Sequence, residues 1–155
     1  GRVDWVTDLA DIPGQYGVKN GYADLGQVFA HSTMAEPRVN AFMMGAMIKG
    51  MGADHVCWGT DAVWTGSPHW QIEALRRLEI PEDMQKKYGF APMGPANGPV
   101  KSAILGLNNA RLYGFSPKQQ AAVLTDKVAY YKEIYDKHGG ERTNLASGYV
   151  LKKIG

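Results

Sequence analysis

Apolar residues recur along most of the chain at spacings of three and four, which is the pattern of amphipathic helices. A first helix is expected from Arg2 to Tyr16, interrupted at Pro13-Gly14, and another opens at Glu36-Pro37 and closes at Gly50. Cap-then-proline signals begin further helices. These are expected from Ser67-Pro68 with a restart at Pro81, from Pro99 to Tyr113, and from Ser116 to His138.

Two short apolar runs predict strands, one from Gly21 to Leu25 and one from His55 to Gly59. Because helices and strands then alternate, the expected strands are parallel, which is typical of an α/β protein. A parallel pair is buried on both faces and needs neighbouring strands. Either the pattern fails to reveal further strands, or the chain is part of a larger protein.

Composition narrows the class of protein. The chain has 155 residues, 45% of them hydrophobic and 21% charged, which suits one globular domain. Its net charge of +2 comes from scattered basic residues, so no basic stripe for nucleic acid is expected. No apolar run is long enough to cross a bilayer, and a single cysteine, Cys57, fits a reducing compartment. The prediction is a cytoplasmic protein without a nucleic-acid or membrane partner.

Asp61 is the candidate functional residue, because it ends the second predicted strand. Functional groups in parallel α/β proteins collect at the carboxyl ends of strands. An aspartate there can bind a divalent metal, accept a proton from a metal-bound water, or cap the helix that follows. The residue pattern alone leaves these three roles open.

Four motifs resemble the amidohydrolase superfamily, in its branch of metal-dependent hydrolases and decarboxylases. They are "NGYADLG" (20–26), "GADHVCWGTD" (52–61), "PHWQIEALRRLEIPEDMQKK" (68–87) and "ILGLNNARLYG" (104–114). The resemblance covers the chain from about Arg2 to Phe115. It implies the C-terminal portion of a (β/α)8 TIM barrel, carrying strands 7 and 8 with flanking helices, in residues 1–115. Residues 116–155 would add a C-terminal helix and tail.

The resemblance also implies roles for single residues. Asp61 matches the family's aspartate that binds the metal or accepts a proton from the attacking water. Trp64 and His31 are expected at the substrate pocket, and Asp24 is interpreted as structural. Asn108 and Arg111 are expected to brace the barrel. The implied cofactor is a divalent metal, zinc by preference, and the implied substrate is a small carboxylated or cyclic molecule.

The chain departs from the family where the family's other metal ligands would stand. Its histidines do not form the H-x-H pattern and single-histidine positions of that family; they are His31, His55, His69 and His138. A TIM barrel also needs about 250 residues and eight strands. The expectation is therefore a fragment that is inactive alone and need not hold the metal of the full-length protein. It would either form a homo-oligomer or join a missing N-terminal barrel half. The alternative is a non-catalytic helical interaction module in which Asp61 is only a cap.

Overall fold

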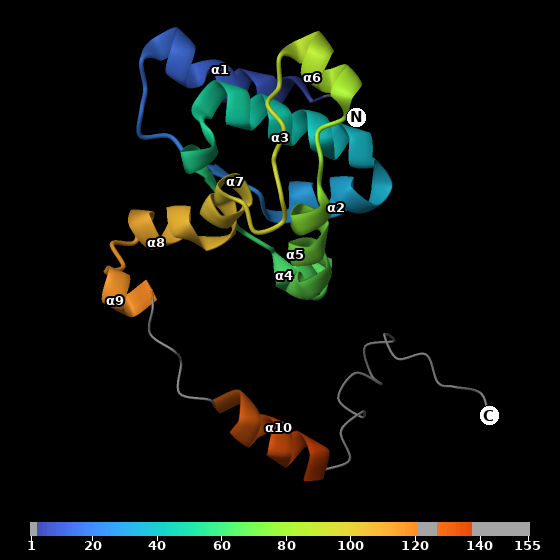
Figure 1. Cartoon of the computed structure of the whole chain (residues 1–155), viewed down its shortest axis with the longest axis vertical. Coiled ribbons are helices and arrows are strands. Elements are labelled where there is room, and N and C mark those ends of the chain that lie inside the picture. The colour runs from blue at the N-terminus through green and yellow to red at the C-terminus, as the bar shows by residue number, and fades with distance from the viewer. Residues whose placement is uncertain (1–2, 121–126, 138–155) are drawn as a thin grey trace, which may run out of the picture. The chain divides into compact units, whose positions relative to one another are not determined.

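The computed structural model describes residues 3–120 and 127–137 (Figure 1). The chain divides into two compact units, Gly1–Ser116 and Pro117–Gly155, which are described separately. Within the described residues, no helix combines the length and the apolar character needed to span a membrane.

Two long helices lie side by side in the first unit, as Figure 1 shows. Helix α1 covers Asp4–Tyr16 and continues past Pro13 until Gly17, whose left-handed backbone ends it. Helix α3 covers Pro37–Met51, in good agreement with the predicted range. Their backbones lie close together at Gly50 of α3, which has no side chain. A Cβ added there would stand 2.2 Å from the Ala10 carbonyl oxygen of α1.

The sheet consists of two parallel strands, β1 (Ala23–Asp24) and β2 (Val56–Cys57). Their parallel direction was expected from the order of elements. Each strand has only two residues, fewer than the sequence suggested. Between the strands the chain forms α2 (Gly26–Ala35), a helix that the sequence reasoning missed, followed by α3 and the short 3-10 helix η1 (Ala53–His55).

The remainder of the first unit is helical. Ser67 accepts the His69 amide and caps α5, as the cap-then-proline signal predicted. The predicted helix from Pro99 to Tyr113 forms three consecutive parts, of which the middle one is a π-helix. The elements are α4 (Ala62–Thr65), α5 (Pro68–Arg77), α6 (Glu82–Tyr88), α7 (Pro99–Ser102), η2 (Ala103–Leu107) and α8 (Asn108–Leu112).

The fold-class prediction was wrong. An α/β chain carrying strands 7 and 8 of a TIM barrel was expected, but the described residues are mostly helical and form one sheet of two short strands. The physical reason lies in the burial. Most of the core is built where α3 packs against α1 and the chain around Phe90, and the two short strands add only Ala23 and Val56 to it.

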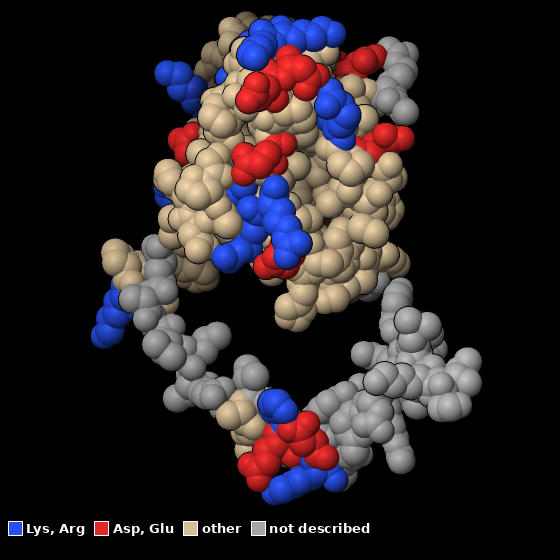
Figure 2. All heavy atoms as spheres, turned by 45° about the vertical axis from the view of Figure 1, so that its right-hand side comes forward, with Lys and Arg blue, Asp and Glu red and all other residues tan. Residues whose placement is uncertain are grey.

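The buried core is rich in methionine. Met43, Met44 and Met47 on α3 are almost completely buried, and Met93 from the segment before α7 is 1% exposed. Unbranched methionine side chains adapt to irregular gaps between helices. Their interpretation as core residues is confirmed. Around this core, the face in Figure 2 shows Lys and Arg interspersed with Asp and Glu.

The second unit contains α9 (Pro117–Gln120) and α10 (Lys127–Lys137). These helices fall within the predicted helix from Ser116 to His138, of which residues 121–126 and 138 lie outside the described part. On α10, the aromatic rings of Tyr130 and Tyr131 are more than half exposed and contact each other edge to face.

Candidate functional site

Asp61 lies beyond the carboxyl end of β2, at the start of α4. It is the only non-glycine residue with positive φ in the described part of the chain, with φ 46° and ψ 37°. Its side chain does not cap α4. Instead, its Oδ2 accepts a hydrogen bond of 2.9 Å from the backbone N–H of Gln27, in the first turn of α2. The carboxylate therefore joins the ends of two segments that are far apart in sequence.

A partly buried network of hydrogen bonds holds the backbone around Asp61 in this conformation. Thr65 Oγ1 lies 2.8 Å from the Thr60 carbonyl oxygen and 3.0 Å from that of Asp61. Gln71 of α5, which is fully buried, donates from Nε2 to the Thr60 carbonyl at 3.0 Å and to Thr65 Oγ1 at 2.7 Å. Left-handed backbone is strained for residues with a side chain and persists where the surroundings fix it. Gln71 and Thr65 supply that support.

Asp24, which ends β1, faces the same region as Asp61. A Cβ on Gly59 would stand 2.3 Å from Asp24 Oδ1, and a Cβ on Gly26 would stand 3.1 Å from Asp61 Oδ2. The Asp24 carboxyl thus occupies space that is open because Gly59, after β2, has no side chain. The Asp61 carboxyl occupies the corresponding space beside Gly26, after β1. Two carboxyl groups therefore lie near the same end of the sheet.

The environment of Asp24, including the charge of Asp61, shifts the pKa of its carboxyl. Burial raises the pKa of the Asp24 carboxyl above its ordinary value, and the nearby charge of Asp61 raises it further, against a lowering hydrogen bond from the Leu25 backbone. A pair of neighbouring carboxylates favours a proton on one of them, because like charges repel. The raised pKa favours the protonated form of Asp24. The sequence pattern gave Asp24 only a structural interpretation, although parallel strands bring their carboxyl ends to one edge.

Cys57 is buried on β2 and unpaired. Burial raises the pKa of its thiol, and the negative charge of Asp24 adds to the rise. A raised pKa keeps the sulfur protonated and unreactive. The interpretation of Cys57 as a packing residue fits this environment.

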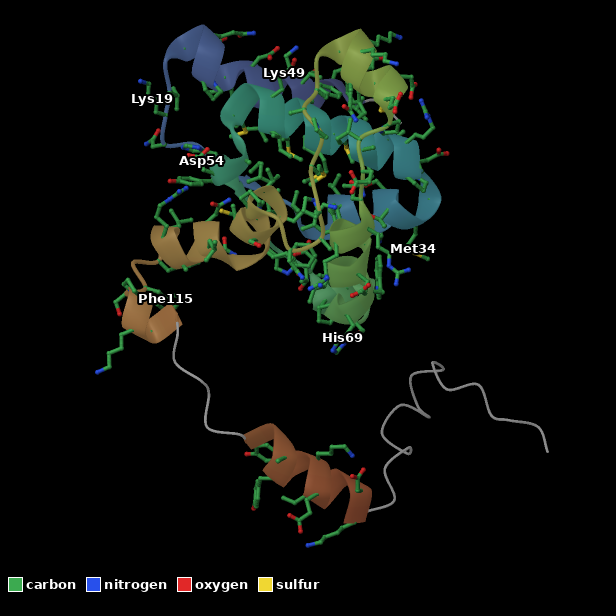
Figure 3. The ribbon with its side chains drawn as sticks, in the orientation of Figure 1. Lys19, Met34, Lys49, Asp54, His69 and Phe115 are labelled. Atoms are coloured by element: carbon green, nitrogen blue, oxygen red, sulfur yellow. The ribbon has the colours of Figure 1, made fainter. Side chains whose placement is uncertain are left out.

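The other predicted site residues lie further out. Trp64 is on α4 and 78% exposed. His31 is exposed on α2 and lines a hollow of about 400 Å³ whose walls do not include Asp61. Among the described residues, no hydrogen bond connects either side chain to Asp61. His69 is exposed on α5 and contacts Ser67 Oγ (Figure 3). The structure brings together Asp61 and Asp24 rather than Asp61, Trp64 and His31.

The donor set fits a metal only in part. Carboxylates bind divalent metals, but zinc takes three or four protein ligands, usually including histidine or cysteine. Across residues 3–120 and 127–137, no group of three or more His, Cys, Asp or Glu side chains is placed to hold a metal ion. These residues do not by themselves fit a zinc ion.

Asparagine and arginine side chains from α8 cover the outer edge of β2. Asn108 Nδ2 donates to the Ala53 carbonyl at 2.8 Å and to the Val56 carbonyl at 2.7 Å. Asn109 donates to the Trp58 carbonyl at 2.9 Å, and Arg111 donates to the Asp54 carbonyl. The "NNAR" sequence thus satisfies carbonyl groups that the two-stranded sheet leaves unpaired on this side.

Comparison with known proteins gave no match, whether to a family model, to a curated protein or to a solved structure. The resemblance to amidohydrolases rests on the four sequence motifs.

Proposed function

We propose that Asp61 is the catalytic carboxylate of a metal-dependent hydrolase or decarboxylase of the amidohydrolase type, acting on a small carboxylated or cyclic substrate. The observation that carries the proposal is the position of Asp61. It lies at the carboxyl end of a parallel strand, in a strained conformation, beside a second carboxyl whose pKa is raised. Strain and shifted pKa values concentrate at functional sites.

Two roles follow for the pair. Asp61 is fixed by the Gln27 amide and by its backbone network, so it is suited to accept a proton from an attacking water at a set position. Asp24, with its raised pKa, is suited to keep a proton that a leaving group could take. Two carboxyls in different environments can divide acid and base work in this way.

The metal enters the proposal only as an expectation from the motifs. Because Asp24 and Asp61 make an incomplete zinc site, further ligands would have to come from outside the described residues. No step is assigned to the metal. On this proposal the chain alone turns over no substrate, and a cytoplasmic location agrees with its unpaired Cys57.

Manganese titration followed by NMR tests the proposal without needing turnover. Mn²⁺ bound at the two carboxyls should broaden the amide signals of Gln27 and Ala62 before others. Asp61→Asn should abolish this broadening while keeping the left-handed backbone, which asparagine tolerates. Asp54→Asn is the matched control, because Asp54 (labelled in Figure 3) is an exposed aspartate on η1, before β2, whereas Asp61 follows β2.

The alternative function, an interaction module, predicts a different result. If Asp61→Asn leaves the broadening unchanged, Asp61 does not bind the ion, and its carboxylate acts only through its hydrogen bond to the Gln27 amide. The exposed tyrosines of α10 would then be the feature to examine.

A further inference from the structure

The two outer edges of the sheet differ. The β2 edge is covered by the side chains of Asn108, Asn109 and Arg111. Directly after β1, the Leu25 amide donates to the Cys57 carbonyl of β2 at 3.2 Å. Successive residues of a parallel strand direct their backbone groups alternately toward and away from the paired strand, so the N–H and C=O of Asp24 point away from β2. No hydrogen bond to those two groups is found in the described part of the chain. An unpaired edge is a template for another strand.

An apolar groove runs along this free edge. A hollow of about 170 Å³ is lined by β1 together with side chains of α1, α2 and α3. It adjoins the hollow of about 400 Å³ beside His31, with which it shares Trp5, Val28 and Met43. Trp5 is 51% exposed and Val28 is 43% exposed. Apolar side chains of an added strand would find contacts there.

A buried amide in the same groove also lacks a partner. Asn40 of α3 lines the smaller hollow and is 1% exposed. Its Nδ2 donates to Thr33 Oγ1, but its Oδ1 accepts no hydrogen bond in the described residues. A buried acceptor without a donor is destabilising, and an incoming polar group can satisfy it.

Charge indicates what kind of strand fits. Asp24 stands at the free edge with Asp61 beside it. If a second copy paired through the same two-residue edge, the two Asp24 side chains would come close together, and like charges on adjacent strands repel. A strand with a basic residue next to Asp24 would instead form an opposite-charge pair.

We propose that the free edge of β1 and its groove bind an extended segment of another polypeptide, in which apolar side chains alternate and a lysine or arginine lies next to Asp24. Backbone hydrogen bonds to Asp24 would provide the affinity, as in other complexes formed by strand addition. The groove would select the apolar side chains. This partner is distinct from any substrate of Asp61.

A capped nine-residue peptide with alternating valine and threonine around a central lysine is the probe, titrated into the full chain. NMR should show shifted amides in residues 22–28 and slower hydrogen exchange of the Asp24 amide. A peptide with a central glutamate should bind about fivefold more weakly, the ratio expected for exchanging an attractive for a repulsive surface pair. A peptide N-methylated along one edge should bind at least about tenfold more weakly, since it loses its backbone donors.

Two variants on one helix localise the binding. Val28→Glu places a charge at the mouth of the groove and should abolish binding, whereas Met34→Glu, on the outward end of α2 and 73% exposed, should not (Figure 3). Equal binding of the N-methylated peptide would overturn the proposal, and so would the absence of binding by all peptides. Protection of the Asp24 amide that grows with protein concentration, without peptide, would identify a second copy as the occupant and also overturn it.

Discussion

Replacing Asn108 by alanine is expected to be among the most destabilising single changes at the sheet. Asn108 is 2% exposed, and its one amide nitrogen serves the carbonyls of Ala53 and Val56. The bond to Val56 is fully buried, so the orphaned carbonyl would cost about 2 kcal/mol, and the partly buried bond to Ala53 about 1 kcal/mol. The expected loss is about 3 kcal/mol, a large share of the stability of a small domain.

Urea denaturation measures this loss. Asn108→Ala should lower the midpoint without changing the slope m, because the unfolded surface is the same. Asn97→Ala is the control, since Asn97 is exposed and only its backbone carbonyl accepts a bond, from Ser102; it should change stability by less than about 0.5 kcal/mol. Asn108→Asp keeps the shape but loses the donor and should be at least as damaging as alanine. The reasoning is refuted if Asn108→Ala behaves like Asn97→Ala.

Two further predictions concern a helix contact and a titration. Gly50→Ala should lower the unfolding free energy by about 1–2 kcal/mol, because its new methyl group would collide with the Ala10 carbonyl. Gly106→Ala is the control in the same urea experiment. Its methyl group would meet no atom within 4 Å, so this change should be neutral or stabilising. Since the pKa of Asp24 is raised in the folded state, folding binds protons, and stability should fall as pH rises from the ordinary aspartate pKa through the raised value. Asp24→Asn should flatten that slope in denaturation curves taken at several pH values, and an unchanged slope would show that Asp24 titrates normally.

The sequence predicted the positions of the main elements better than their assembly. Helical spacing located α1 and α3, and the cap at Ser67 located the start of α5. The sequence pattern did not reveal α2, whose first residue is Gly26 with φ 41°. A short helix of low amphipathicity that begins at a glycine resembles a loop when read locally. The spacing of Leu25 and Phe29, both buried, was the available signal.

The site was predicted in part. Asp61 was singled out because it ends a strand, and the structure places it at such an end, but its catalytic role stays a prediction. Asp24 was interpreted as structural, because its position near Asp61 depends on the register that sets Asp24 beside Cys57. Register arises from long-range pairing, which a local pattern does not contain. The roles of Asn108 and Gln71 were equally hidden, since both act by satisfying backbone groups distant in sequence.

Both proposals involve Asp24, and the side chains of the partner strand would change the pKa of its carboxyl. An apolar strand laid against the β1 edge would exclude water from Asp24 and raise its pKa further, because burial disfavours the charged form. A lysine or arginine next to it would lower the pKa and favour the carboxylate. The same edge that binds a partner would therefore influence whether Asp24 carries a proton. A strand with a basic residue at that position would favour the ionised form of Asp24, which is the form that a divalent cation requires of a carboxyl ligand.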